Sequence, residues 1–172
     1  LKPGGIAAQW IPLHSQGEAE VDMHFKTFRS VFPYTMGWMS VANEILIIGS
    51  DQPIQIDFNK LKVRLEEPEI KKALADIEIP NIFSFLSNIW LLDEQIQALG
   101  KSHPLITDNH PAIEFYLDLG NVIDVSGREK YVFNRASFDQ VADHIENLTA
   151  ADRRLLKPHY DAMDLYQRGV MY

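Results

Sequence analysis

The chain has no cysteine among its 172 residues. A disulfide framework, a thiolate zinc site and a cysteine nucleophile are therefore excluded, and the absence fits a reducing compartment.

Clusters of basic residues are scarce as well. Lysine and arginine number 16 against 24 aspartates and glutamates, which gives a net charge of −8. The only adjacent basic pairs are Lys71-Lys72 and Arg153-Arg154, and acidic residues surround both. Because phosphate backbones are bound by clustered lysine and arginine, we expect no nucleic-acid partner.

Long apolar runs are also missing. The longest largely apolar stretch, 82–92, contains Ser84, Ser87 and Asn88 and is much shorter than the roughly 20 residues of a membrane-spanning helix. It predicts a buried helix instead. No signal peptide is visible, and the first residue is leucine inside a motif, so we expect the N-terminus to be a cut within a longer chain.

The first third of the chain has the pattern of a strand, a helix and two further strands. Residues 1–5 predict a helix end and a tight turn, and the apolar run 6–11 predicts a strand covered on both faces. Ser15 and Glu18 have the spacing of a capping box, and Pro33 stops the helix that follows. The apolar face of this helix consists of Val21, Phe25, Phe28 and Phe32.

Two strands are predicted next, over 34–40 and 44–50, with 41–43 as a hairpin between them. Beyond Asp51 the patterns change to short helices. They are predicted over 58–65, over 68–77 with Pro68 in the first turn, over 82–90, from Asp93 to Gly100, from Ser137 capped with Gln140, and from Thr149 capped with Asp152. Pro158 is expected to kink or end the last of them. The stretch 103–126 is rich in turn residues and predicts no regular element.

Several of these residues form a family resemblance. The run Leu1-Lys2-Pro3-Gly4-Gly5 before a strand resembles the start of the fifth strand of Rossmann-like methyltransferases. The phenylalanine-rich helix ending Val31-Phe32-Pro33, and the strand pair ending Ile45 to Ser50, look like the last third of the spermidine synthase family. The run Leu105 to Pro111 followed by Glu114-Phe115 is similar to a signature of its bacterial branch, in which the domain is fused to membrane-spanning segments. The similarity covers about residues 1–117.

The resemblance implies an aminopropyltransferase that moves an aminopropyl group from decarboxylated S-adenosylmethionine to a diamine. The family uses a carboxylate to deprotonate the amine. That carboxylate and the glycine-rich nucleotide-binding turn belong to the half that precedes the matching region, and this sequence contains no GxGxG run. We therefore expect a fragment that binds no cofactor, holds no catalytic residue and is inactive alone.

The sequence also departs from the family. Ordinary spermidine synthases have a Gln-x-Glu-Ser run after the fifth strand, whereas Gln9 is followed here by Trp10-Ile11-Pro12. The Tyr-Pro-Ser-Gly stretch that lines the diamine pocket is replaced by 36–40, Met-Gly-Trp-Met-Ser. These departures put the polyamine substrate in doubt and leave the fold expectation intact.

Four residues are candidates for substrate binding: Gln9, Trp10, Asp108 and Glu114. Gln9 and Trp10 stand at the carboxyl end of a predicted strand, where Rossmann-like folds bind ligands. The alternative is that Trp10 packs under the following helix and Gln9 caps a backbone group. Asp108 and Glu114 could contact a cationic amine, or Asp108 could belong to an Asx-turn or helix cap before Pro111.

A metal site is not expected. The six histidines, which are His14, His24, His103, His110, His144 and His159, include no i, i+4 pair. His103 and His110 flank Asp108, so a three-ligand site there is a minor alternative. A nucleophilic hydrolase lacks its GxSxG motif.

The fold we expect is α/β: residues 1–56 supply the last strands of a Rossmann-like sheet, 57–117 form a helical cap, and 118–172 form a helical extension of unknown role. The first strand would leave an unpaired sheet edge. We expect this edge to pair with the chain's own N-terminal half or with a second copy, or to be covered by the C-terminal helices. The expected location is cytoplasmic, and the resemblance leaves attachment of the parent to the inner membrane open.

Two functions remain. One is the C-terminal part of an aminopropyltransferase that contributes a wall of the substrate pocket. The alternative is a non-catalytic interaction or regulatory domain on a degenerate transferase scaffold.

Overall fold

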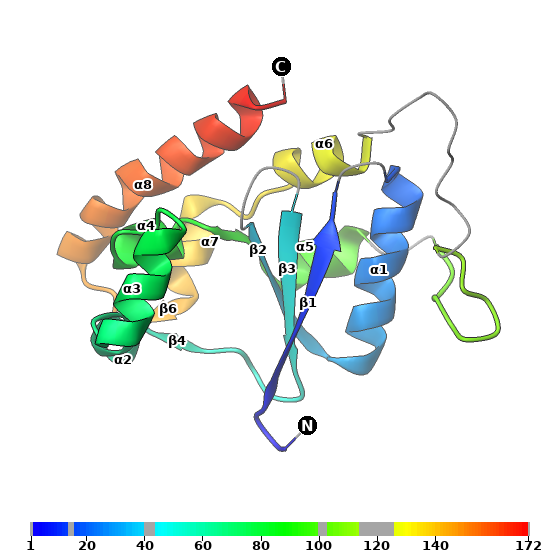
Figure 1. The fold of residues 1–172 in the computed structure, drawn as a ribbon, viewed down its shortest axis with the longest axis horizontal. Helices are drawn as coiled ribbons and strands as arrows, with labels where there is room; N and C mark the ends of the chain where they lie inside the picture. Colours follow the sequence, from blue (N-terminus) through cyan, green and yellow to red (C-terminus); the bar gives the residue numbers. More distant parts are fainter. Residues whose placement is uncertain (1, 14–15, 40–43, 100–102, 114–125, 172) are drawn as a thin grey trace. The chain divides into compact units, whose positions relative to one another are not determined.

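The computed structural model describes residues 2–13, 16–39, 44–99, 103–113 and 126–171. Within these ranges the chain is a mixed α/β protein, as predicted (Figure 1). Its elements are, in order, β1 (Ile6–Pro12), α1 (Glu18–Val31), β2 (Tyr34–Met39), β3 (Glu44–Ser50), β4 (Ile56–Asp57), α2 (Phe58–Leu65), α3 (Pro68–Asp76), α4 (Ile82–Leu86), β5 (Ile89–Leu91), α5 (Asp93–Leu99), α6 (Ser126–Phe133), α7 (Phe138–Asp143), β6 (Ile145–Glu146) and α8 (Ala150–Gly169). No helix in the described part of the chain has the length and apolar character to cross a membrane.

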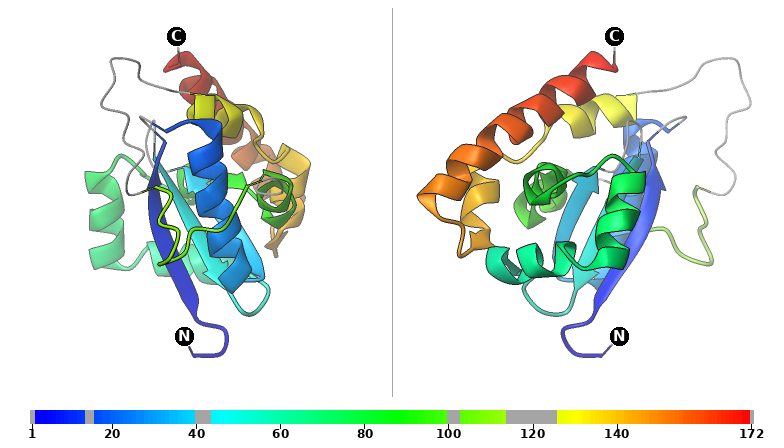
Figure 2. Two further views of the ribbon diagram at one scale, coloured as in Figure 1. Left: turned by 90° about the vertical axis from the view of Figure 1, so that its right-hand side faces the viewer. Right: turned by 60° about the vertical axis from the view of Figure 1, so that its left-hand side comes forward.

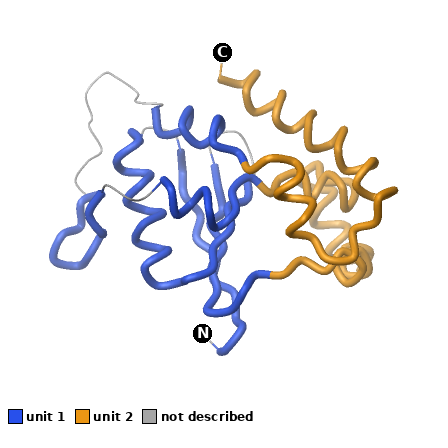
Figure 3. Tube along the Cα trace, turned by 180° about the vertical axis from the view of Figure 1, so that it is seen from behind, with its two compact units in different colours: residues 1–54, 90–135 blue, residues 55–89, 136–172 orange. Residues whose placement is uncertain are grey.

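Two compact units make up the chain, and each is built from two separate stretches (Figure 3). Unit 1 comprises Leu1–Ile54 and Trp90–Arg135, and unit 2 comprises Gln55–Ile89 and Ala136–Tyr172.

The main sheet has the strand order β1-β3-β2-β5. Strand β3 is antiparallel to both β1 and β2, so β1 and β2, which α1 connects, run parallel to each other. Trp10 pairs with Leu46, and Leu46 pairs with Trp38, so these three side chains share one face of the sheet. The antiparallel pair predicted over 34–50 is confirmed.

Helices α1 and α5 lie on the opposite face. A Cβ atom at Gly49 would lie 2.7 Å from Cβ of Phe32, so α1 approaches the sheet closely at this glycine. Thr35, which pairs with Gly49, donates a hydrogen bond of 2.7 Å to Asp93 at the start of α5. Figure 2 shows α1 lying along the strands. Its buried residues include Val21, Phe25 and Phe28, as the apolar periodicity predicted.

The helix start is a correction. We expected Ser15 to cap α1, but the helix begins at Glu18 with Gly17 as its N-cap, and Ser15 lies outside the described residues. The backbone N–H of Glu18 donates instead to the hydroxyl of Ser126, 3.3 Å away, so a distant part of the chain supplies the hydrogen-bond partner.

Strand β1 is also less buried than predicted. Ile6 is 61% exposed and Trp10 is 51% exposed, so the strand is not covered on both faces. The physical reason is its position: β1 is an edge strand, and the unit 1 helices that contact the sheet lie on the face away from Ile6 and Trp10.

The predicted helix over 82–90 ends early. Helix α4 stops at Leu86, and Ile89 and Trp90 belong to β5, which extends the sheet beside β2. An available sheet edge here overrides the helical periodicity. Asp93 begins α5 as its first helical residue and accepts hydrogen bonds from Arg29 and Thr35, so it is not the cap we predicted.

In unit 2, α4 packs against α8, and β4 and β6 form a short parallel pair. The predicted capping boxes Ser137–Gln140 and Thr149–Asp152 are both present. Helix α7 ends at Asp143, and Ile145 lies in β6. Helix α8 continues through Pro158 to Gly169, so the proline does not end it.

Candidate functional site

Gln9 and Trp10 occupy the predicted strand, but they do not share a surface. As neighbours on β1 they point to opposite faces: Gln9 pairs with Ile47 on the face that α1 covers, and Trp10 pairs with Leu46 on the other. Both side chains are exposed. Trp10 therefore does not pack under α1, which was the alternative explanation for it.

Asp108 lies at the tip of a tight turn. Thr107 and His110 form an isolated bridge in which the N–H of His110 donates to the carbonyl of Thr107 at 2.8 Å and the reverse bond measures 3.2 Å. The four residues of the turn are exposed. This geometry is what turn chemistry requires. Glu114 lies outside the described residues, so its position relative to Asp108 is not described.

Sequence reasoning missed a group of polar side chains at the beginning of α1. We call it the α1–α6 polar cluster, and it consists of Glu18, Asp22, His103, Lys130 and Tyr131. At its centre is Asp22, whose side chain is only 2% exposed. Oδ2 of Asp22 lies 2.8 Å from Nζ of Lys130 and 3.6 Å from Nε2 of His103, and the hydroxyl of Tyr131 donates to Oδ1 at 3.3 Å.

The electrostatics of the cluster hold Lys130 charged and Tyr131 neutral. Burial alone lowers the pKa of Lys130, but hydrogen bonds to Asp22 and Glu18 and their charges outweigh burial and leave this pKa raised. Burial, reinforced by the charge of Asp22, raises the pKa of Tyr131 well above its usual range. The buried carboxylate is thus matched by one cation and one neutral hydroxyl donor.

Backbone contacts fasten the segment from His103 to Ile106 onto α1. The ammonium group of Lys26 donates to the carbonyl of His103, and the N–H of Ile106 donates to the hydroxyl of Thr27 at 2.8 Å. The contact of His103 with Asp22 therefore belongs to a longer attachment. The alternative of a three-ligand site at His103, Asp108 and His110 is not supported, because within the ranges that the structure describes no three His, Cys, Asp or Glu side chains form a metal-binding group.

The side chains of the cluster pair with one another: Asp22 contacts Lys130, His103 and Tyr131, and Glu18 also binds Lys130. Lys130 and Tyr131 on α6 both bind Asp22 on α1, so these contacts join the two helices. A sequence signal for it did exist, because Asp22 falls within the apolar stripe of α1 beside Val21 and Phe25. A carboxylate in such a stripe needs a partner.

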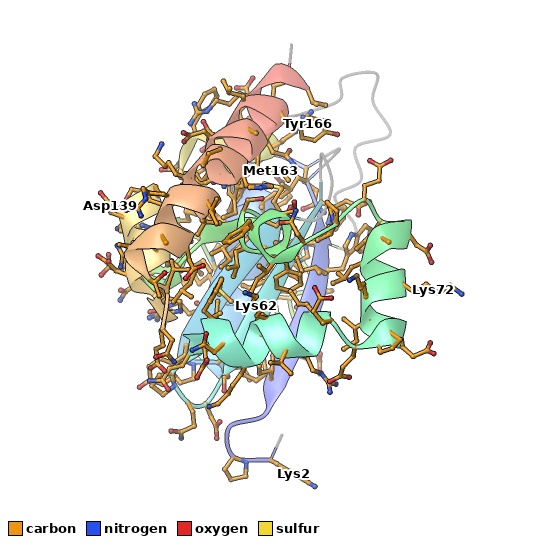
Figure 4. The ribbon with its side chains drawn as sticks, turned by 90° about the vertical axis from the view of Figure 1, so that its left-hand side faces the viewer. Lys2, Lys62, Lys72, Asp139, Met163 and Tyr166 are labelled. Atoms are coloured by element: carbon orange, nitrogen blue, oxygen red, sulfur yellow. The ribbon has the colours of Figure 1, made fainter. Side chains whose placement is uncertain are left out.

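In unit 2 a pocket of about 200 Å³ lies between α2, α3 and the start of α4. Leu65, Leu74 and Ile82 line it, together with Lys62, which Figure 4 shows on α2. This volume is below the roughly 300–1,000 Å³ typical of small-molecule sites, so the pocket is a weak candidate.

Comparison with known proteins adds no relative: no protein-family model, curated protein or solved structure matches the chain.

Proposed function

We propose that the chain is the C-terminal part of a Rossmann-like, spermidine synthase-like transferase, in which it completes the sheet and contributes one wall of the substrate pocket. The main support for the proposal is that β1 is an edge strand of the sheet and has exposed apolar side chains on one face.

The order of the strands supports this proposal. Two parallel strands, β1 and β2, are connected by α1, and the later strand β3 lies between them and is antiparallel to both. This is the strand-helix-strand-strand arrangement that the resemblance implies for the end of such a sheet.

The chemistry of the β1 edge supports it too. The strand Ile6–Pro12 contains no charged residue, and Ile6, Ala8 and Trp10 are exposed on one face. Proteins usually protect exposed edges with charges, bulges or covering segments. We infer that the occupant of this edge is a strand from the nucleotide-binding half of the same transferase.

In this proposal Gln9 and Trp10 stand near the carboxyl end of β1, where ligands bind in doubly wound sheets. The α1–α6 polar cluster would hold the adjoining helix start in place. Decarboxylated S-adenosylmethionine would be held by the other half, because this sequence has no glycine-rich turn to receive it. Asp108, exposed in its turn, would reach the substrate only as a peripheral contact.

A non-catalytic interaction domain is the second candidate. It is favoured by the absence of two runs found in spermidine synthases, Gln-x-Glu-Ser and Tyr-Pro-Ser-Gly. The corresponding strands here, β1 (Ile6–Pro12) and β2 (Tyr34–Met39), contain neither run. A domain without those runs could keep the fold while no longer transferring an aminopropyl group.

Calorimetric titration distinguishes the two candidates. The chain alone and the chain extended to a full Rossmann half would each be titrated with decarboxylated S-adenosylmethionine and methylthioadenosine. We expect binding by the extended chain only. Binding by the chain alone contradicts the proposal, and silence from both favours the interaction domain.

The edge itself can be tested with a matched pair of substitutions. Ile6→Lys places a charge on β1, and Val63→Lys places the same charge on α2, where Val63 is 73% exposed. In the extended chain we expect Ile6→Lys to lower the melting temperature and Val63→Lys to leave it nearly unchanged. Equal effects would show that β1 is not covered there. Light scattering of the chain alone would reveal a second copy bound at this edge instead.

A further inference from the structure

Arg128 on α6 is a buried cation that the proposed transferase function does not use. The residue is only 8% exposed. Its neighbour Gly127 packs so closely on the chain before α1 that a Cβ atom there would lie 2.8 Å from the carbonyl oxygens of Gln16 and Gly17. The start of α6, which holds Gly127 and Arg128, therefore packs against Gln16 and Gly17, the two residues before α1.

Two donor atoms of this guanidinium group, Nε and Nη2, are buried and have no hydrogen-bond partner among the residues that the structure describes. Arginine stays protonated in proteins, so the charge cannot be removed by losing a proton. A buried charge without a partner is strongly unfavourable, and buried polar groups in native proteins are nearly always satisfied. Within the described residues, no carboxylate pairs with Arg128.

The neighbouring carboxylates have other partners. Glu18 and Asp22 both bind Lys130, at 3.3 and 2.8 Å. Glu129, the next residue on α6, is exposed. Oε1 of Gln16, a residue whose backbone Gly127 approaches, is also buried and has no partner within the described ranges.

Arg29 provides a comparison for the unpaired donors of Arg128. Nε and Nη2 of Arg29 form the same edge of the guanidinium group, and they donate to Oδ1 and Oδ2 of Asp93 at 3.2 and 2.9 Å. This side-on fork matches two oxygens of one carboxylate or phosphate group. Arg128 has the same two donor atoms, and neither has a hydrogen-bond partner in the described part of the chain.

We propose that Arg128 is the receptor for an oxyanion, a carboxylate or phosphate group of a small molecule, held by Nε and Nη2 in a bidentate pair. The burial of the site strengthens such a bond, because the effective dielectric constant there is low. The proposal stands on Arg128 and Arg29 and does not require the chain to be a transferase.

Thermal unfolding of the full chain tests the proposal. Melting temperatures would be measured in sodium phosphate, sodium acetate and sodium chloride at equal ionic strength, for the wild-type chain and for Arg128→Met. We expect phosphate or acetate to stabilise the wild type beyond chloride, by a factor in the folded-to-unfolded ratio of about 100 when the anion is at 100 times its dissociation constant. Arg128→Met should lose this difference. Whether phosphate or acetate stabilises the wild-type chain more identifies which of the two groups the site binds.

Two further variants complete the design. Arg29→Met removes the arginine that is already paired with Asp93, so it should be less stable than wild type but keep the anion response. Arg128→Lys keeps the charge and loses the fork, so it should fold and respond at least tenfold more weakly. An equal anion response in wild type and Arg128→Met would overturn the proposal. So would a loss of stability in chloride for Arg128→Met as large as that for Arg29→Met, because it would show that Arg128 is already paired within the chain.

Discussion

Replacement of Asp22 by alanine would test how strongly the α1–α6 polar cluster holds the fold. The substitution leaves the Tyr131 hydroxyl buried without an acceptor, which costs about 1–3 kcal/mol. Lys130 also loses its bond to Asp22, but it keeps Glu18 at 3.3 Å and its side chain is 22% exposed, so we add only about 1 kcal/mol. The expected loss of unfolding free energy is about 2–4 kcal/mol.

Urea unfolding at neutral pH measures this loss, and a surface ion pair supplies the control. Asp161 on α8 binds Lys157 at 2.6 Å, but both side chains are about half exposed. Asp161→Ala should therefore cost less than about 1 kcal/mol. A double-mutant cycle with Lys130→Met should give a coupling energy of about 1–2 kcal/mol with Asp22. If Asp22→Ala costs no more than Asp161→Ala, the buried pairing of α1 with α6 is wrong.

Two further outcomes are expected. Gly127→Ala should destabilise the chain by about 1–3 kcal/mol in urea unfolding, because the new Cβ would lie 2.8 Å from two backbone carbonyl oxygens and this cost exceeds the gain of about 1 kcal/mol in helix propensity. The control Gly169→Ala should be neutral or stabilising, because no atom lies within 4 Å of the added Cβ. Similar values for both variants would contradict the close packing of α6 on α1. Burial lowers the pKa of His24 below 6.5, so the unfolded chain takes up the proton first and stability present above pH 6.5 is lost as the pH falls. His24→Leu should therefore flatten the dependence of unfolding free energy on pH below 6.5. An unchanged slope would show that His24 is not the group responsible.

Part of the candidate site was predictable from the sequence. The turn at Asp108 followed from local chemistry, because Asp-Asn before His-Pro selects a turn without help from the rest of the chain. Gln9 and Trp10 were correctly placed on a strand, but their exposure was not predictable. It depends on which elements cover β1, and periodicity within the strand contains no such information.

The sequence by itself determined the elements whose signals are local. The apolar face of α1, the strand β3 and the capping boxes at Ser137 and Thr149 each depend on residues within one or two turns of one another. Only the tertiary structure decided what lies far apart in sequence. Asp22 and Lys130 are separated by 108 positions, and Trp90 became a strand residue because β2 offered it an edge. Hydrogen-bond partners and sheet edges come from residues far away in the sequence. The partner of a buried carboxylate, and whether a short apolar run forms a helix or a strand, therefore depend on the tertiary structure.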